Sequence, residues 1–414
     1  MPQSEIKKCQ NCQQDFTIEP EDFEFYDKIK VPLPTFCPEC RMQRRMTWRN
    51  ELSLYKRKND FSGENIISAI SSDKSFKVYD HKTWWSDNWD PMDYGKDYNW
   101  NKSFFEQFKE LLKQVPMVSL FNGNAVKTEY AQHALESKDC YLISAALENE
   151  NMMYSNRIWK CADSLDIYIG FNLQLCYEIF NCRESYHLFY SRNCRNCSNS
   201  IFLFDCANCN DCFGCVNLRN KSYCIFNKPY SKEEYKRKIQ EFNLGNYRKF
   251  LEMKEKFQEI YRTALHKYAN LRKAINVIGD NVEEGKNCYF CFDLFGLVED
   301  SKFLWWGGGN CKDSYDGGPG IGDCSELLYE GVDNGIQSSC TKFSVVIWGC
   351  RDTDYCFNCH SSSNLFGCIG LRHKEYCILN KQYTKEEYEK MVPKIIEHMN
   401  EKPYVSKSQI PNKF

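Results

Sequence analysis

Two pairs of cysteines near the start of the chain have the spacing of metal ligands. Cys9 and Cys12 form one C-x2-C pair, Cys37 and Cys40 form the other, and 24 residues separate the pairs. Four thiolates in this pattern are typical of one tetrahedral zinc site. A segment of about forty residues cannot bury enough surface to fold alone, and zinc–thiolate bonds supply the missing free energy. The sequence therefore predicts one Zn2+ ion held by these four cysteines; four thiols without a metal are the alternative.

A helix is expected directly behind the second pair. The run from Arg41 to Trp48 has a helical pattern, which places Cys40 near a helix N-terminus, where a thiolate is favoured. This arrangement indicates a treble clef. The same region resembles the "probable zinc-ribbon" family, in which a CxxC pair, an aromatic stretch with Phe-Tyr, a proline and a CPxCR sequence follow one another. The matching positions are Cys9, Cys12, Phe25, Tyr26, Pro34, Cys37, Pro38, Cys40 and Arg41. The resemblance covers the first tenth of the chain and implies zinc binding, but no activity.

Basic residues dominate the segment from 41 to 58, where Glu51 is the single acid. Arginine and lysine bind phosphates, and an aromatic ring can stack on an unpaired base. The segment is therefore a candidate nucleic-acid surface, with RNA ahead of DNA as the ligand. Its residues are Arg41, Arg44, Arg45, Trp48, Arg49, Lys56, Arg57 and Lys58. The alternatives are a solvated helix face, or a helix docked on the acidic repeats further along the chain.

The overall composition is that of a folded chain without a charge bias. The 414 residues are 42% apolar, and 54 Lys and Arg stand against 56 Asp and Glu, which excludes a globally basic nucleic-acid coat. No apolar run approaches about 20 residues, and the start MPQSEIKKCQ lacks a signal-peptide pattern, so we expect a cytoplasmic protein without membrane contact. In a reducing compartment the 25 cysteines are expected in metal sites or as buried thiols.

Short β-rich runs recur every 9 to 15 residues from residue 136 onward. Recurrence of this kind indicates a parallel β-helix, with two runs in each coil of about 23 residues. The expected turns carry Asn or Asp directly before Cys, because Asx residues accept left-handed backbone and Cys is a small buried residue. These pairs are Asp139-Cys140, Asn181-Cys182, Asn193-Cys194, Asn196-Cys197, Asp205-Cys206, Asn208-Cys209 and Asp211-Cys212.

The repeats occur twice in the chain. Residues 213–235 align without gaps on residues 366–388, with 16 of 23 positions identical. Both segments end in a capping box, which predicts a helix leaving the last coil of each region. With its front module, this pattern resembles uncharacterised cysteine-rich repeat proteins, some of which carry a CaiB/BaiF CoA-transferase label. That activity needs an α/β fold with alternating helices, which the repeats lack, so we do not expect it here.

The predicted fold is mainly β with helical additions: an N-terminal four-cysteine zinc module, then two parallel β-helix-like solenoid blocks separated and capped by helices. The expected parts are 1–60 (zinc-ribbon or treble-clef module with basic helix), 61–135 (aromatic-rich connector with a capping helix), 136–230 (first solenoid block), 231–280 (long amphipathic helical segment), 281–383 (second solenoid block) and 384–414 (C-terminal helix and tail).

Charge is segregated along the chain. Residues 246–276 carry eight Lys or Arg against three Glu, whereas residues 281–339 hold eleven acids against three lysines. Two surfaces for different partners would have this pattern, as would two parts of the chain that attract one another. In the acidic region Asp313, Asp316 and Asp323 lie near Trp305 and Trp306, a combination that suits a glycan.

Other chemistry is less well supported. The run Cys206-x2-Cys209-x2-Cys212-x2-Cys215 has ferredoxin-like spacing, but it shares the Asx-Cys turns of cysteines that have no neighbour at metal spacing. We therefore expect a zinc-binding, non-enzymatic scaffold that interacts with nucleic acid or with a protein. The alternatives are a β-helix protein that binds or processes glycans through the acidic, Trp-rich second block, and a pure protein-assembly scaffold.

Overall fold

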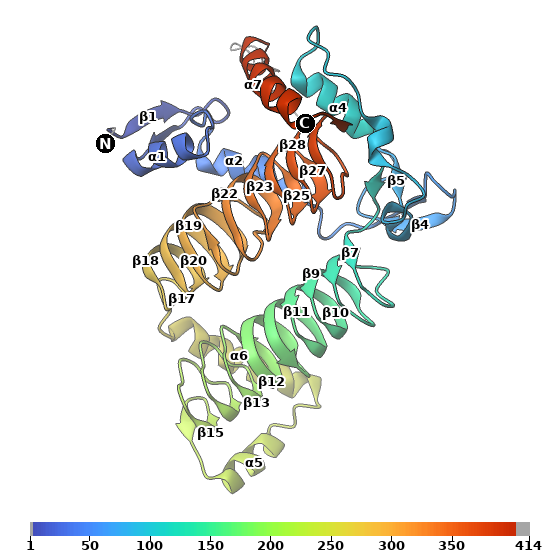
Figure 1. The fold of residues 1–414 in the computed structure, drawn as a ribbon. Helices are drawn as coiled ribbons and strands as arrows, with labels where there is room; N and C mark the ends of the chain where they lie inside the picture. The colour runs from blue at the N-terminus through green and yellow to red at the C-terminus, as the bar shows by residue number, and fades with distance from the viewer. Residues whose placement is uncertain (1–2, 403–414) are drawn as a thin grey trace.

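The computed structural model describes residues 3–402, and in this part the chain is mainly β-structure with seven α-helices. Two stacks of parallel strands form most of the molecule, with helices at their ends and along their sides (Figure 1). The prediction of a mainly β chain with helical additions is confirmed. The expected C-terminal tail, from residue 403, lies outside the described residues.

The N-terminal part contains three two-stranded sheets and four α-helices. Its elements are β1 (Glu5–Lys8), β2 (Asp15–Ile18), α1 (Pro20–Lys28), α2 (Pro38–Met46), β3 (Tyr55–Lys58), β4 (Asn65–Ser68), β5 (Val78–Tyr79), α3 (His81–Trp84), the 3-10 helix η1 (Pro91–Tyr94), α4 (Phe104–Gln114) and β6 (Met117–Val118). We call residues 5–46, from β1 to the end of α2, the cysteine module.

Two long ladders of strands follow. Block 1, residues 122–229, consists of β7 (Asn122–Gly123), β8 (Gln132–Leu135), β9 (Tyr141–Leu147), β10 (Glu150–Trp159), β11 (Ala162–Gln174), β12 (Tyr177–Arg192), β13 (Ser198–Ile201), β14 (Asn210–Phe213), β15 (Ser222–Ile225) and β16 (Lys228–Pro229). Block 2, residues 271–382, consists of β17 (Leu271–Arg272), β18 (Ile275–Glu283), β19 (Gly285–Phe295), β20 (Val298–Gly308), β21 (Cys311–Lys312), β22 (Tyr315–Gly317), β23 (Ser325–Ile336), β24 (Ser339–Lys342), β25 (Val345–Trp348), β26 (Arg351–Asp354), β27 (Phe357–His360), β28 (Ser363–Phe366), β29 (Glu375–Ile378) and β30 (Lys381–Gln382).

The coils are much shorter than the sequence suggested. In block 1 the parallel pairs join residues 12 positions apart, as in Leu165↔Tyr177 and Ser198↔Asn210, and only the last pair of strands, β15 with β16, is antiparallel. In block 2 the spacing varies around the same value, from 11 residues in Ile275↔Lys286 to 14 in Cys311↔Ser325, and it is 12 in Ser339↔Arg351. The expected coil of about 23 residues is therefore wrong. A chain that comes back over itself after 12 residues leaves room for a single layer of inward side chains.

Left-handed backbone makes so tight a coil possible. Over most of block 1 a positive φ recurs at every third residue, and the next residue points inward. We call the residue of positive φ the corner residue. In one coil the corner residues are Asp205, Asn208, Asp211 and Gly214, and the inward residues are Cys206, Cys209, Cys212 and Cys215. All seven predicted Asx-Cys pairs have a corner Asx and a buried cysteine, so this part of the prediction is confirmed.

Small polar side chains satisfy the backbone inside the coils. The hydroxyl of Ser185 donates to the carbonyl of Arg183 at 2.8 Å and accepts the backbone N–H of Cys197 at 3.2 Å. Cys197 Sγ lies 3.3 Å from the carbonyl of Arg195, the same contact with sulfur in place of oxygen. Cysteine and serine side chains therefore make equivalent hydrogen bonds to the backbone here, which explains why the buried interior contains both.

Replacing Ser185 tests this role. Ser185→Ala is expected to lower the free energy of unfolding by about 1–3 kcal/mol, because it leaves the buried N–H of Cys197 without a partner. Ser185→Cys should be milder, since Cys182 Sγ accepts the N–H of Cys194 at 3.3 Å in the same way. Urea unfolding monitored by circular dichroism measures both variants; equal losses would show that the hydrogen bond is not what matters.

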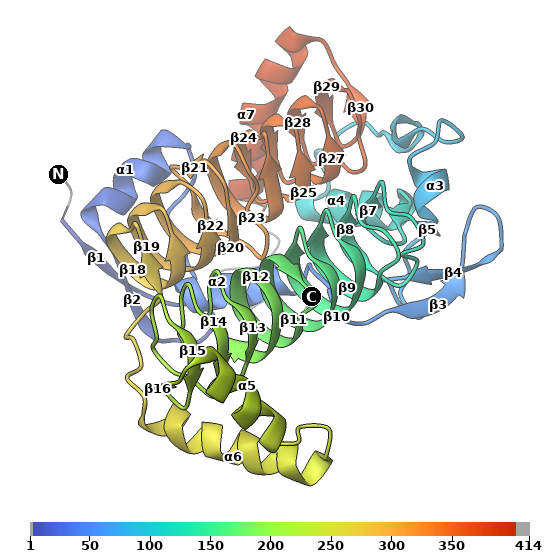
Figure 2. The same cartoon turned by 90° about the horizontal axis from the view of Figure 1, so that it is seen from below.

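Helices cover the last coils of both blocks. After block 1 come α5 (Lys232–Glu241) and α6 (Tyr247–Thr263), and after block 2 comes α7 (Lys385–Glu401). Both α5 and α7 begin with the predicted capping box. Figure 2 shows α5 and α6 at the end of block 1. The segment expected to be helical from 231 to 280 therefore contains two helices, and strand pairing resumes at residue 271.

The two blocks are joined by charged and aromatic contacts. Arg157 of β10 pairs with Asp293 of β19 at 3.2 Å, and its guanidinium lies 4.4 Å from the ring centre of Trp305. Phe171 and Phe295 are in edge contact, with ring centres 4.6 Å apart. Attraction between parts of the chain, one of the two explanations given for the segregated charge, therefore describes these contacts.

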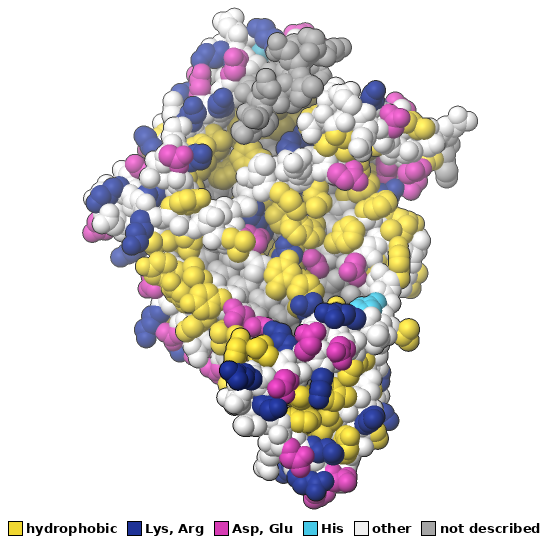
Figure 3. Space-filling view, turned by 180° about the vertical axis from the view of Figure 1, so that it is seen from behind, with side chains coloured by type: hydrophobic (Ala, Val, Ile, Leu, Met, Phe, Trp, Pro, Cys, Tyr) yellow, Lys and Arg dark blue, Asp and Glu magenta, His cyan; other side chains and the backbone are white. Residues whose placement is uncertain are grey.

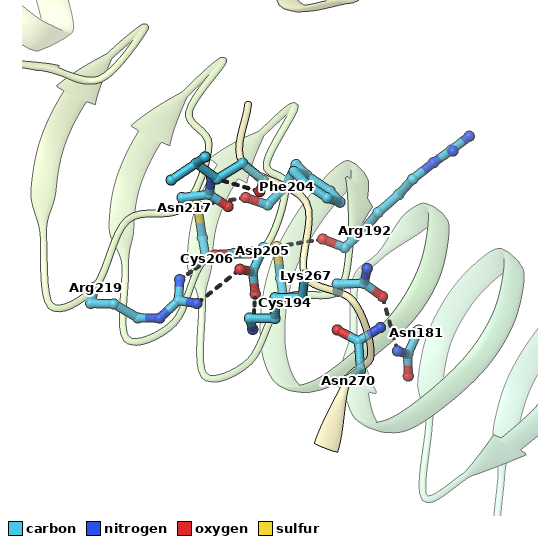
Figure 4. A network of polar contacts seen from close by, with 12 residues as sticks. Asn181, Arg192, Cys194, Phe204, Asp205, Cys206, Asn217, Arg219, Lys267 and Asn270 are labelled. Atoms are coloured by element: carbon cyan, nitrogen blue, oxygen red, sulfur yellow. Dashed lines mark hydrogen bonds and ion pairs between the residues drawn. The ribbon is translucent and has the colours of Figure 1, made fainter. Parts of the chain in front are cut away.

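A second polar link connects block 1 to the segment before block 2. Corner residue Asp205 accepts Arg219 at 3.0 Å and Lys267 at 2.6 Å (Figure 4). Neighbouring corner asparagines also bond to each other across coils, as Asn181 does to Asn193 at 2.9 Å. These contacts hold the corners in register along the block.

Candidate metal centre and its docking surface

The four predicted ligands meet at one point. Cys9 and Cys12 lie in the loop between β1 and β2, and Cys37 and Cys40 lie at the start of α2. Their Sγ atoms are all within 4.8 Å of one another, and three of the four side chains are buried. Within residues 3–402 this is the one group of three or more possible ligands at such distances. The arrangement could hold a metal ion.

The local backbone helps the cluster to carry negative charge. Cys37 is the N-cap of α2 and its backbone N–H donates to Cys9 Sγ at 3.2 Å, while the amide of Asn11 donates to Cys40 Sγ at 3.3 Å. Burial opposes ionisation of Cys9, but backbone N–H groups of Cys37, Cys12 and Asn11 outweigh it and lower the pKa of Cys9 to about 6. Burial raises the pKa values of Cys37 and Cys40. Metal binding replaces thiol protons, so a site that already favours the thiolate of Cys9 suits a cation.

The helix behind the cluster begins earlier than predicted and faces inward. Helix α2 starts at Pro38, so Cys40 lies within its first turn. Its arginines contact corner residues of block 2: Arg41 lies 2.9 Å and Arg45 3.2 Å from Asp316, and Arg44 lies 2.6 Å from Glu330. Asp316 is 0% exposed. The ion pairs of Arg41 and Arg45 are therefore removed from water, whereas the side chain of Arg44 is 41% exposed.

Burial governs the charges at this contact. It opposes the charge of Arg41, but Asp316 outweighs it and raises the pKa of Arg41. Burial raises the pKa of Glu330, and Arg44 and Arg45 oppose that shift. Beside these pairs Phe25 of α1 stacks on Tyr315 with ring centres 3.8 Å apart. The cysteine module therefore packs on block 2 through a cluster of buried apolar side chains and through the buried ion pairs beside it.

A fourth arginine, Arg49, links the segment after α2 to both blocks. Arg49 pairs with Glu51 at 2.7 Å and with Asp333 of block 2 at 3.4 Å, and Asp333 also accepts His133 of block 1 at 2.7 Å. Burial opposes the charge of Asp333, but Arg49 and His133 outweigh it and lower the pKa of Asp333 to about 2. This carboxylate is a fixed anion at a junction of three parts of the chain.

The structure separates the eight residues of the candidate nucleic-acid surface. Arg41, Arg45 and Arg49 are buried in ion pairs, and the side chain of Arg57 is 7% exposed and bonds to carbonyls of residues 70, 71 and 76. The outward residues are Arg44, Trp48, Lys56 and Lys58. Helix α2 packs on block 2, as in the alternative of a helix docked on the acidic repeats.

The residues considered for a glycan are also dispersed. Asp316 lies under α2, Asp313 pairs with Lys28 at 3.0 Å, and Asp323 is exposed. Trp305 and Trp306 lie against Arg157, at 4.4 and 5.0 Å. Two block 1 arginines that meet block 2 were not among the predicted site residues: Arg157, and Arg183, whose guanidinium lies 4.3 Å from the ring centre of Phe295. A lone arginine within a β-run gives little signal, although the acidic excess of block 2 indicated that basic partners were needed.

No helix among the described residues is both long and apolar enough to cross a membrane. On the face seen from behind, positive and negative side chains alternate among hydrophobic ones, so neither sign dominates it (Figure 3).

Comparison with known proteins gives no family for this chain. No protein-family model matches it, and no curated protein matches it. Among solved structures, a match is the crystal structure described as a "putative acetyltransferase" from Desulfovibrio desulfuricans G20, at 9% identity and a TM-score of 0.13. The match covers 59% of this chain and 65% of that chain, which is less than two thirds of its length. At this TM-score the likeness carries no argument about fold or function.

Proposed function

We propose that the chain is a zinc-binding, non-enzymatic scaffold that binds a protein partner. The position of α2 is the observation that supports this proposal most. Arg41 and Arg45 are buried against Asp316 and Glu330, so their charges are neutralised within the chain. A helix in this state has little attraction left for phosphates. The positive charge of the module serves to attach it to block 2.

The metal in this proposal is one Zn2+ ion held by Cys9, Cys12, Cys37 and Cys40. Four thiolates close the coordination sphere and leave no position for a substrate, as in structural zinc sites. Two of the ligands belong to the first residues of α2, so the ion fixes the start of the helix whose arginines reach Asp316. Zinc binding and docking on block 2 are coupled in this way.

The blocks serve as rigid β-solenoids in the same proposal. Each coil pairs with its neighbours only, so rows of side chains from successive coils form long surfaces. Block 1 exposes such a row of large apolar side chains, which include Tyr141 (40% exposed), Met153 (41%) and Tyr154 (52%). Contiguous exposed apolar surface is typical of protein-binding sites.

Nucleic-acid binding is the second candidate, and the hairpin of β3 and β4 favours it. Tyr55, Lys56 and Lys58 on β3 are exposed, and Trp48 nearby in the chain is 40% exposed. Two lysines beside exposed aromatic rings could bind a short single strand. This surface is smaller than the one that the sequence predicted.

Metal content and bound nucleic acid distinguish the two candidates. Elemental analysis of the purified chain is expected to give one zinc per polypeptide, with the ultraviolet absorption ratio of protein alone. Lys56→Glu with Lys58→Glu should leave that ratio unchanged, as should the control Lys232→Glu with Lys236→Glu on α5. Nucleic acid that remains bound to the native chain, and is lost only in the β3 variant, would favour the second candidate. Several metal ions per chain would contradict the assignment of one zinc site.

A further inference from the structure

The two blocks can be compared position by position. Phe213 and Phe366 are equivalent in the gapless alignment of residues 213–235 with 366–388. Each then lies on a ladder of parallel pairs: Met153↔Leu165, Leu165↔Tyr177 and Ile201↔Phe213 in block 1, and Lys302↔Tyr315, Tyr315↔Tyr329 and Asp354↔Phe366 in block 2. Counting coils back along these ladders makes Leu165 equivalent to Tyr315 and Tyr177 equivalent to Tyr329.

The corner residues beside these ladders have the same pattern in both blocks. Asp166 is equivalent to Asp316, and Glu178 to Glu330. An aromatic corner residue lies on each side of the acidic pair: Tyr154 and Tyr190 in block 1, Phe303 and Phe343 in block 2. All eight residues have φ between 48° and 58°, so their side chains leave the coil in the same way. Block 1 therefore repeats the surface on which block 2 holds α2.

In block 2 three elements cover this surface, and both of its acidic residues are buried. The cysteine module covers Phe303, Asp316 and Glu330, with the guanidinium of Arg41 5.6 Å from the ring centre of Phe303. Helix α4 covers the following coils, since Phe104 lies 5.3 Å from Tyr355 between ring centres. Helix α7 then covers the end of the block, where Tyr388 contacts Tyr376.

In block 1 only part of the equivalent surface is covered. Helix α5 takes the place of α7, since Tyr235 contacts Tyr223 as Tyr388 contacts Tyr376. Helix α6 takes the place of α4, with Phe257 on Phe202, the equivalent of Tyr355. In the described chain no element takes the place of the cysteine module. Asp166 and Glu178 are exposed, and within residues 3–402 neither forms an ion pair.

From this comparison we propose that the surface of block 1 around Asp166 and Glu178 binds an α-helix of a partner protein that carries arginines spaced like Arg41, Arg44 and Arg45. This inference rests on the proposed scaffold function, and it specifies the kind of partner: a helix with a basic face. Two observations support it: the acidic pair is repeated in both blocks, and this surface is continuous with the one that α6 already covers. The chain's own α2 cannot occupy it, because it is held on block 2.

One difference between the blocks specifies the partner further. Lys302 of block 2 pairs with Glu21 at 2.9 Å and Asp22 at 2.7 Å of α1, whereas the equivalent residue of block 1 is Met153. Met153 and Leu165 are 41% and 38% exposed. The partner is therefore expected to present apolar side chains where α1 presents carboxylates, next to its arginines. A nucleic acid does not fit, because Asp166 and Glu178 repel phosphates.

A helix-stapled peptide with the sequence of residues 38–50, with Cys40→Ser, is the probe. Titrated into the full-length zinc-loaded chain, it is expected to bind. Asp166→Asn with Glu178→Gln should weaken binding by about tenfold or more, which is roughly 1.4 kcal/mol. The control Glu136→Gln removes an exposed corner acid elsewhere on block 1 and should change the affinity less than about twofold. A peptide in which the three arginines are replaced by glutamine should not bind.

Three results would overturn the proposal: no binding of the arginine peptide, equal binding to the double variant, or equal binding of the glutamine peptide. Self-association that the double variant abolishes would make a second copy the occupant, and would also overturn it. Circular dichroism checks that the double variant is folded. The zinc and nucleic-acid measurements do not depend on this surface, so failure here is distinguishable from failure of the proposed function.

Discussion

The Asp316→Ala variant is expected to lose about 3–5 kcal/mol of unfolding free energy. Asp316 is 0% exposed and pairs with Arg41 and Arg45. Its removal leaves two buried guanidinium groups with Glu330 as their main remaining partner. An uncompensated buried charge is among the most destabilising single defects in a folded protein. Urea unfolding followed by circular dichroism measures the loss.

Asp166→Ala is the matched control, because Asp166 occupies the equivalent corner position of block 1. It is exposed and has no ion pair in the described chain, so its replacement should change the unfolding free energy by no more than about 0.5 kcal/mol. The same substitution is thus made on the same backbone conformation, with φ of 56° and 55°. Equal effects at the two positions would mean that the arginines of α2 do not depend on Asp316.

The cluster of four cysteines could be predicted from the sequence because its constraint is local. Two C-x2-C pairs each place two sulfurs on one loop, and a zinc site needs only that the two loops meet. The Asx-Cys pairs are local in the same sense, since a corner residue and its inward neighbour are adjacent. Positions such as Asp205 and Cys206 therefore indicated the turns correctly.

The coil length could not be predicted in this way. Of every three residues, only the inward one must be small or apolar. Many corner residues, such as His187, Tyr190 and Phe202, are large or aromatic, so the period of three is not visible in the sequence. The sequence shows clearly only those runs in which outward residues are also apolar. Such runs recur irregularly, and this irregular spacing favours the wrong interpretation of two runs in each coil. The strict 12-residue spacing appears only when the pairs of the ladder are known.

The docking of α2 required information that lies far away in the chain. Arg45 and Asp316 are separated by 271 positions. The sequence showed a basic helix and an acidic repeat region, but opposite charge alone does not distinguish an internal contact from a surface for a partner. The arginines of block 1 that meet block 2 gave no comparable signal, because each stands alone in its strand. Only the folded arrangement shows which of these charged residues pair with each other.

Removal of the metal is expected to release the cysteine module from block 2. Structural zinc contributes about 10–16 kcal/mol in small zinc-binding peptides, and two of the four cysteines lie at the start of α2. Chelation, or Cys40→Ser, should therefore increase hydrogen exchange of the α2 amides by about a thousandfold, roughly 4 kcal/mol. The inward amides of block 1 should keep their protection. Cys324→Ser is the control, since Cys324 is exposed and outside the cluster.

The effect of Asp316→Ala on stability should also depend on whether the metal is bound. If zinc fixes α2 and α2 buries Asp316, then Asp316 becomes exposed once the metal is removed, and its carboxylate no longer neutralises buried arginines. In the chelated chain the effect of Asp316→Ala is therefore expected to fall from about 3–5 to about 0.5 kcal/mol, as in a coupled pair of sites. An undiminished effect after chelation would show that packing such as that of Phe25 on Tyr315 holds the module without the metal. The comparison thus measures directly how much of the docking of the module depends on its four thiolates.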